Sequence, residues 1–267
     1  MELYREIINA PHTLIAGTTG SGKSVVLNGI IREILLSHTD TTAELYMVDP
    51  KAVELYQYHA ICKGYTEEAA EVPFMLDGII DTMETRYKTM RDRGENKWTG
   101  SHIYIVIDEL ADLMISPQNK AIKLKMQKIL QKGRASAITI IAATQAPNRQ
   151  IIPANLVLNF TNRLALRCLS SIESRQIVNQ SGAELLPKYG KGIYLSPDGI
   201  KQVEIPLTPS NKDVIGRWAE QAEEEVIVIS KPVAQRTAPV IDYNYAEKFY
   251  IALGVGLMGM GVLVALI

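Results

Sequence analysis

Short apolar runs alternate along the chain with longer segments in which apolar residues recur every three or four positions. A compact apolar run between polar residues is typical of a buried strand, and the three-or-four spacing is typical of an amphipathic helix. Strands that alternate with helices indicate an α/β fold with a mainly parallel central sheet flanked by helices. The predicted strands span 12–16, 45–49, 103–107, 138–143, 164–166 and 193–195, and the predicted helices span 24–36, 72–93, 119–132 and 211–225.

The two ends of the chain depart from this alternation. Residues 1–11 are expected to form only a short lead-in to the first strand. Residues 249–267 are 19 positions without a charge, close to the ~20 apolar residues that span a bilayer. Cations precede this run and none follows it, so the positive-inside rule keeps the rest of the chain in the cytoplasm. A C-terminal transmembrane helix in the cytoplasmic membrane is therefore predicted, and a buried C-terminal helix is the alternative.

The first predicted strand leads into a glycine-rich stretch that fits G-x-x-x-x-G-K-[ST], the phosphate-binding loop of nucleotide-binding enzymes. Its glycines are expected to adopt positive φ and to approach an anion closely, so that successive N–H groups converge on phosphates. The helix that follows adds its positive end. Lys23 is expected to reach the β- and γ-phosphates of ATP, and the Ser24 hydroxyl to ligate Mg²⁺. The predicted nucleotide-binding residues are Gly17, Thr18, Thr19, Gly20, Ser21, Gly22, Lys23 and Ser24.

Polar residues follow two later strands, where open α/β sheets place their ligand-binding residues. The strand 103–107 ends in Asp108 and Glu109. Phosphoryl transfer needs a metal that opposes the phosphate charge and a base for water, so we assign Asp108 to Mg²⁺ and Glu109 to the attacking water. Gln145 follows the strand 138–143 and is placed to sense the γ-phosphate. Asp49 also ends a strand, either at the ligand site or as a solvated strand end.

Charge and cysteine content narrow the possible functions. The 267 residues carry 28 Lys and Arg against 29 Asp and Glu, a net charge of −1, so the chain as a whole is not a polycation. Two cysteines without a C-x-x-C spacing suit a reducing compartment. Residues 113–172, however, contain nine cations and no acid, which is either a solvated helix face or a set of phosphate contacts to nucleic acid. These cations are Lys120, Lys123, Lys125, Lys128, Lys132, Arg134, Arg149, Arg163 and Arg167.

Seven motifs in order give the chain a specific resemblance: A-G-T-T-G-S-G-K-S at 16–24, D-P-K at 49–51, M-E-T-R-Y-K-T-M at 83–90, I-D-E-L-A-D-L-M at 107–114, Q-K-G-R-A at 131–135, A-T-Q at 143–145, and S-S-I-E-S-R at 170–175 followed by Q-S-G-A-E. With them the chain resembles the FtsK/SpoIIIE family of motor ATPases. The family's A-T-Q-R-P appears here as A-T-Q-A-P, one basic residue short.

The resemblance implies a RecA-like P-loop NTPase domain that assembles into a ring, usually a hexamer, with ATP between subunits and double-stranded DNA in the pore. By position, Arg134 resembles the arginine finger that reaches a neighbour's γ-phosphate, and Gln145 the γ-phosphate sensor. Arg175 resembles the arginine of the family's S-R motif, with a role at the nucleotide or at the interface. The catalytic residues are then Lys23, Glu109, Arg134 and Gln145.

The expected function is ATP-dependent translocation of double-stranded DNA by a membrane-anchored ring, in DNA transfer or partitioning. Two alternatives within the same superfamily are a virus assembly or DNA-packaging ATPase and an FtsK-like ATPase that powers protein secretion. A non-enzymatic scaffold is disfavoured by the intact Lys23, Asp108 and Glu109. The expected organisation is a motor domain at 1–207, a helix and linker at 208–248, and the transmembrane helix at 249–267.

Overall fold

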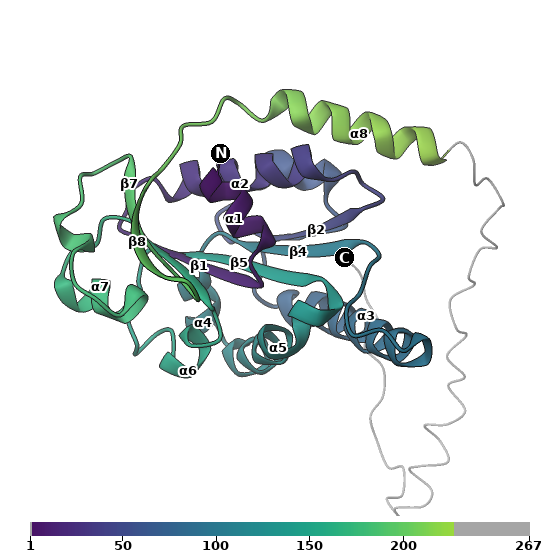
Figure 1. The fold of residues 1–267 in the computed structure, drawn as a ribbon, viewed down its shortest axis with the longest axis horizontal. Helices are drawn as coiled ribbons and strands as arrows, with labels where there is room; N and C mark the ends of the chain where they lie inside the picture. Colours follow the sequence, from purple (N-terminus) through teal and green to yellow (C-terminus); the bar gives the residue numbers. More distant parts are fainter. Residues whose placement is uncertain (1, 227–267) are drawn as a thin grey trace, which may run out of the picture. The chain divides into compact units, whose positions relative to one another are not determined.

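The computed structural model describes residues 2–226, which are built around an eight-stranded sheet in the order β3-β2-β4-β5-β1-β6-β7-β8 (Figure 1). Every pairing from β3 to β6 is parallel, and β7 and β8 join antiparallel, which confirms the α/β class. The strands are β1 (His12–Ala16), β2 (Ala43–Val48), β3 (Gly64–Thr66), β4 (His102–Ile107), β5 (Ile138–Thr144), β6 (Asn162–Ala165), β7 (Lys191–Ser196) and β8 (Gly199–Glu204).

Helices connect most of these strands. They are α1 (Glu2–Asn9), α2 (Lys23–Ser37), α3 (Val72–Arg93), α4 (Leu110–Ile115), α5 (Asn119–Lys132), α6 (Ala154–Val157), α7 (Ser171–Val178) and α8 (Lys212–Val226), with 3-10 turns η1 (Tyr56–Ile61), η2 (Gly133–Ser136) and η3 (Ala183–Leu185).

The parallel strands give the sheet two distinct edges. β1 lies between β5 and β6, and its last residue, Ala16, is paired with Thr144 of β5 and Ala165 of β6. The carboxyl ends of β1, β4 and β5 therefore meet along one side, which we call the carboxyl edge. The same strands start along the opposite side, the amino edge, with His12 and His102.

One layer of helices covers each face of the sheet. Figure 1 shows α1, α2 and α8 on one side and α3 and α5 on the other. Two separate clusters of buried apolar side chains fill the two faces, one beneath α1, α2 and α8 and the other beneath α3, α4 and α5. Val214 and Trp218 of α8 are 2% and 4% exposed in the first of these clusters.

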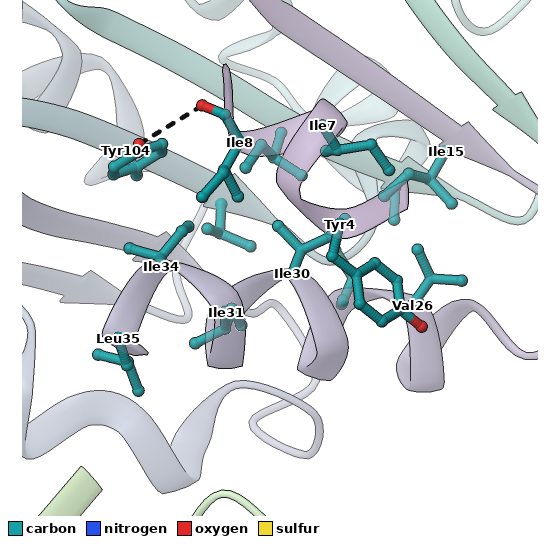
Figure 2. Close-up of a cluster of buried hydrophobic side chains, with 14 of the residues drawn as sticks. Tyr4, Ile7, Ile8, Ile15, Val26, Ile30, Ile31, Ile34, Leu35 and Tyr104 are labelled. Atoms are coloured by element: carbon teal, nitrogen blue, oxygen red, sulfur yellow. Dashed lines mark hydrogen bonds between the residues drawn. The ribbon is translucent and has the colours of Figure 1, made fainter. Parts of the chain in front are cut away.

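The first residues form a packed helix, so the prediction of a mere lead-in is wrong. Figure 2 shows Tyr4, Ile7 and Ile8 of α1 against the buried face of α2. The Tyr4 ring lies on Gly29, where an added Cβ would stand 2.4 Å from two ring carbons. The Tyr4 hydroxyl donates to the Pro206 carbonyl at 2.7 Å. α1 therefore packs on α2 and is hydrogen-bonded to the segment that follows β8.

Long periodic segments were the easiest to predict. The helices expected at 72–93 and 119–132 are α3 and α5, those at 24–36 and 211–225 correspond to α2 and α8, and all six predicted strands are confirmed. The shorter elements α4, α6, β3 and β8 were not predicted. Within residues 2–226 no helix is both long and apolar enough to cross a bilayer. The predicted transmembrane helix at 249–267 and most of the preceding linker lie outside the described residues.

Candidate functional site

The phosphate-binding loop joins β1 to α2 at the carboxyl edge. Gly20 and Gly22 have φ of 73° and 99°, as the sequence predicts. Gly17 is not among the glycines with positive φ, so that part of the prediction is wrong. Glycine is needed at position 17 for a steric reason, because a Cβ there would stand 2.5 Å from Ser21 Oγ and 2.8 Å from Leu166 Cβ. The loop closes tightly on itself at Gly17 and turns through its other two glycines.

The loop leaves several backbone donors free. Within residues 2–226, the N–H groups of Gly20, Gly22, Lys23 and Ser24 have no acceptor. The last two begin α2, whose first turn cannot pair its own N–H groups and carries the positive end of the helix dipole. Converging free donors of this kind bind an anion such as phosphate.

Neighbouring strands hold the loop in place. Gly17 N–H donates to the Thr144 carbonyl at 3.2 Å, and Thr18 N–H donates to the Arg167 carbonyl at 3.0 Å. The Thr19 hydroxyl donates to Gln145 Oε1 at 2.6 Å. The predicted sensor therefore contacts the loop that binds the phosphates, as its position at the end of β5 requires.

Lys23 is buried beside two acids. Lys23 is only 8% exposed. Burial lowers the pKa of its ammonium group, and the negative charges of Glu109 and Asp108 oppose that shift. These two carboxylates favour the ammonium form of Lys23 and partly offset the cost of its desolvation. The structure thus brings together the three residues that the sequence assigned to phosphate, water and metal.

Glu109 follows β4 and links it by hydrogen bonds to the end of β5. Its carboxylate accepts from the Thr144 hydroxyl at 2.7 Å and from the Gln145 N–H at 3.0 Å. The Ala111 N–H donates to the same carboxylate at 3.3 Å, so Glu109 also caps α4. These three donors satisfy the oxygens of a carboxylate that is only 3% exposed. A carboxylate fixed in this way is positioned to accept a proton from water.

Asp108 has a different environment, crowded with acids. Burial raises its pKa to about 6, and the charges of Asp49 and Glu54 add to that shift. Glu54 Oε1 accepts the Ser24 hydroxyl at 2.5 Å. The sequence did not point to Glu54, since it lies in the irregular stretch between β2 and η1; its position five residues beyond Asp49 was the only signal.

Asp49 is fully buried, so it is not a solvated strand end. Its Oδ2 accepts the Leu55 N–H at 2.8 Å and fixes the loop that carries Glu54. Lys51, two residues along, is exposed, with its Nζ 4.0 Å from Asp112.

A Mg²⁺ ion would have few protein ligands at this edge. Within residues 2–226, no group of three or more His, Cys, Asp or Glu side chains is arranged to hold a metal. Mg²⁺ in phosphate-binding sites is held by one or two protein oxygens, with phosphate oxygens and water completing its octahedron. The Ser24 hydroxyl and the Asp108 carboxylate fit that mode of binding.

Arg134 lies at the other side of the sheet. It belongs to η2, which precedes the first residue of β5, while Thr144 is the last residue of that strand and the phosphate-binding loop lies beside that end. β5 has seven residues, so ~20 Å of strand separates Arg134 from its own loop. The side chain is exposed, and it has no hydrogen bond or ion pair within the part of the chain that the structure describes. Arg134 does not join the site of its own chain.

The basic segment is partly neutralised by the packing of α5 on α3. Lys125 pairs with Asp77, and Lys128 with Glu84 at 3.0 Å. Lys132 lies 3.9 Å from the same glutamate. A fourth cation, Arg163, is buried and donates to the Ile177 carbonyl. The count of nine unopposed cations along the chain therefore overstates the basic surface.

Sequence comparisons agree on one family. The family model for the FtsK/SpoIIIE family matches residues 2–185. The protein named DNA translocase FtsK 1 of Neisseria meningitidis serogroup A is 30% identical over 281 residues, covering 90% of this chain and 34% of the relative. DNA translocase FtsK of Borreliella burgdorferi is 34% identical over 209 residues, covering 72% of this chain and 26% of the relative. This chain thus spans about a third or less of these curated relatives.

Solved structures share the fold. The monomer form of the pCW3 conjugation coupling protein TcpA with ATPγS has a TM-score of 0.72 at 23% identity, covering 80% of this chain and 66% of that one. The cytoplasmic domain of the Type VII secretion ATPase EccC of Thermomonospora curvata has a TM-score of 0.64 at 19% identity, covering 88% of this chain and 30% of that one. At these identities the likeness establishes the fold alone.

Proposed function

The chain belongs to the FtsK/SpoIIIE family of P-loop ATPases, and we propose that it hydrolyses ATP to move along double-stranded DNA. The observation that carries the proposal is the meeting of Lys23, Asp108 and Glu109 at a loop with unpaired backbone donors. The relatives named as DNA translocases support the choice of DNA as the substrate that is moved.

Each residue at the carboxyl edge has a part in hydrolysis. The free N–H groups and Lys23 bind the β- and γ-phosphates, and Ser24 and Asp108 hold Mg²⁺, which supplies positive charge against the phosphates. Water attacks the γ-phosphorus, the bond to the oxygen shared with the β-phosphorus breaks, and Glu109 takes the proton of the water. Gln145 contacts the loop through Thr19 and responds to the γ-phosphate.

Arg134 extends the proposal to an oligomer. It is exposed at the amino edge, about 20 Å of strand away from its own loop, so it reaches a γ-phosphate only on another copy of the chain. An arginine finger supplied in this way is worth ~10³–10⁵ in rate. We therefore propose a homo-oligomeric ring, hexameric as the family resemblance implies, with ATP at each interface.

The proposal also places the motor at the cytoplasmic membrane. Residues 249–267 are uncharged over 19 positions and preceded by Lys231, Arg236 and Lys248. A span of ~20 apolar residues and the positive-inside rule favour an anchor with the ATPase domain in the cytoplasm. A membrane-anchored DNA motor suits DNA transfer or partitioning.

Protein transport is the second candidate. It is favoured by the ion pairs of Lys125, Lys128 and Lys132 with α3, which remove three cations from the basic segment that was counted toward DNA contacts. A protein motor needs no such basic surface.

The test is the ATPase rate of the full chain with and without linear double-stranded DNA. We expect DNA to raise the rate, with an affinity that falls as salt rises because bound counterions are released. Lys23→Ala and Glu109→Gln should remove the stimulated rate. Turnover that ignores DNA would favour protein transport, and no turnover at concentrations where the chain assembles would overturn the ATPase itself.

A further inference from the structure

The motif M-E-T-R-Y-K-T-M at 83–90 lies in the second half of α3, apart from the phosphate-binding loop. Two of its side chains, Arg86 and Tyr87, hydrogen-bond to the backbone at both ends of η2, the turn that carries Arg134. We propose that Arg86 and Tyr87 are positioning residues, which fix η2 so that Arg134 is held ready for the ATP site of a neighbouring copy. The inference rests on the proposed role of Arg134 in trans and assigns the residues that support it.

Arg86 is a buried cation that binds the end of η2. It is 3% exposed, and its Nη1 donates to the Ser136 carbonyl at 2.7 Å and to the Ala137 carbonyl at 3.3 Å. Glu44 Oε1 lies 3.9 Å from Nη2, and the centroid of the Trp98 ring lies 5.1 Å from Cζ. The acid and the ring offset the cost of burying the charge. Because a guanidinium is planar and its donors have fixed directions, these contacts define where η2 ends.

The residue that ends η2 has a backbone conformation that needs such support. Ala137 has φ of 53° and ψ of 51°, a left-handed conformation that is unfavourable for a residue with a Cβ. Conformations of this kind persist only where the surrounding structure holds them. The Ala137 carbonyl accepts from Arg86 and, at 2.9 Å, from the Ile103 N–H of β4. Contacts from α3 and β4 therefore hold the strained residue in place.

The start and the middle of η2 are also held. The Tyr87 hydroxyl donates to the Lys132 carbonyl at 2.7 Å, just before the turn. The Trp98 N–H, from the loop that follows α3, donates to the Ala135 carbonyl at 2.8 Å. The backbone is thus anchored on both sides of Arg134 by α3 and the loop after it.

This anchoring sets where the Arg134 side chain begins. Gly133 and Ser136 are buried, whereas Arg134 between them is exposed. A Cβ at Gly133 would stand 2.7 Å from the Ile138 carbonyl oxygen, so the turn lies directly against the start of β5. A finger stabilises the transition state only from the correct position, and a misplacement of ~1 Å can cost ~10²-fold in rate. Hydrolysis should therefore depend on the residues that fix η2.

The first test is steady-state hydrolysis by Arg86→Lys and Tyr87→Phe in the full chain. Lysine keeps the charge but lacks the fork of donors, so the rate should fall by ~10²-fold. Phenylalanine removes one hydrogen bond, so the rate should fall by ~3- to 10-fold. ATP affinity should stay the same in both variants, because neither residue lies at the phosphate-binding loop.

Tyr65→Phe is the matched control. Its hydroxyl donates to Glu67 Oε1 at 3.3 Å, beside the edge strand β3, and its loss should leave hydrolysis unchanged. Wild-type rates in both Arg86→Lys and Tyr87→Phe would overturn the inference.

The second test separates the positioning of Arg134 from a general effect on the fold. In a chain that already carries Arg134→Ala, Arg86→Lys and Tyr87→Phe should lower hydrolysis no further, because they act through that arginine alone. A further fall as large as that in the wild-type background would overturn the inference.

Mixed rings show on which side of the interface Arg86 acts. Arg86→Lys mixed with Lys23→Ala should regain part of the rate, because some interfaces then join an intact loop to an intact finger. Arg86→Lys mixed with Arg134→Ala should regain none, and recovery in that mixture would overturn the inference. If Arg134→Ala hydrolyses ATP at the wild-type rate, the role in trans and the inference fail together, whereas loss of hydrolysis in Lys23→Ala would still support the proposed ATPase.

Discussion

The same strands run between the two edges of the central sheet, yet the edges differ in what they can do alone. At the carboxyl edge Lys23, Glu109 and Gln145 lie together within one chain, linked by charge or hydrogen bonds. At the amino edge Arg134 is exposed and meets no acid within residues 2–226. The carboxyl edge therefore gathers the candidate phosphate-binding and catalytic residues of one chain. The amino edge exposes an arginine that has no partner among residues 2–226 of its own chain. The proposed ring uses this difference, because it joins the carboxyl edge of one copy to the amino edge of the next.

The largest effects are expected from changes at the carboxyl edge. Lys23→Ala should abolish binding of ATP and of tripolyphosphate, because it removes the buried cation that faces the phosphates. Glu109→Gln should keep ATP binding and lower the hydrolysis rate by ~10²–10⁴, the usual contribution of a general base. Equilibrium binding and steady-state hydrolysis separate the two effects. An unchanged rate in Glu109→Gln would remove Glu109 from the chemistry.

Arg134→Ala tests the amino edge. It should lower hydrolysis by ~10³-fold or more while ATP affinity stays the same, because a finger acts on the transition state. Mixing it with Lys23→Ala should restore part of the rate, since a ring of both variants contains interfaces with an intact loop and an intact finger.

Arg93→Ala is the matched control, an exposed arginine at the end of α3. It should leave hydrolysis unchanged. Two inactive variants that stay inactive when mixed, in rings shown to contain both, would contradict an active site shared between copies.

The two edges should also respond to acid with opposite sign. Burial lowers the pKa of His12 and of His102 at the amino edge to about 4. Between pH 6.5 and 4 the unfolded chain takes up these protons and the folded chain does not, so the free energy of unfolding falls as pH drops, by ~3 kcal/mol per histidine. Burial raises the pKa of Asp108 to about 6, so the folded chain binds that proton first and gains stability over nearly the same range.

Urea denaturation between pH 7 and 4 separates these contributions. Asp108→Asn should lose more stability on acidification than the wild type, because the opposing gain is gone, and His102→Gln should lose less. The same loss in all three proteins would mean that these groups are not buried as the structure places them.

Two glycines on opposite faces of the sheet give the smallest expected effects. Gly29→Ala should lower the free energy of unfolding by ~1–3 kcal/mol, because the new methyl group displaces the Tyr4 ring. Gly78→Ala on α3 meets nothing within 4 Å and should raise it by ~0.5–1 kcal/mol through reduced backbone freedom. Thermal denaturation of both variants checks the pair. A stabilising Gly29→Ala would show that α1 does not pack on α2.

The sequence was sufficient to predict an element or a loop where its apolar pattern was long or its motif had a fixed spacing. The periodicity of 72–93 and 119–132 predicted α3 and α5 with their observed bounds. β3 has three residues and β8 is mostly exposed, so neither leaves an apolar run to detect. α1 was overlooked because eight residues before a proline resemble a lead-in, although Tyr4 and Ile7 are completely buried.

At the carboxyl edge, the sequence pointed to the residues that lie in motifs and not to those whose position depends on tertiary packing. The loop, Asp108 and Glu109 follow from spacing alone. Glu54 approaches Ser24 only because Asp49 fixes the intervening loop. Lys125 and Lys128 of α5 look unpaired in the sequence, but they form ion pairs with acids of α3, which lies far earlier in the chain. Contacts between distant segments leave no local pattern in a chain.

Movement along DNA is the central claim, and displacement of a third strand from a linear duplex tests it most directly. The full chain with ATP should release a triplex-forming oligonucleotide while the two duplex strands stay paired. Glu109→Gln, which binds ATP but does not turn it over, should release none. Hydrolysis of ATP by the wild-type chain on the same duplex, without release of the third strand, would contradict translocation.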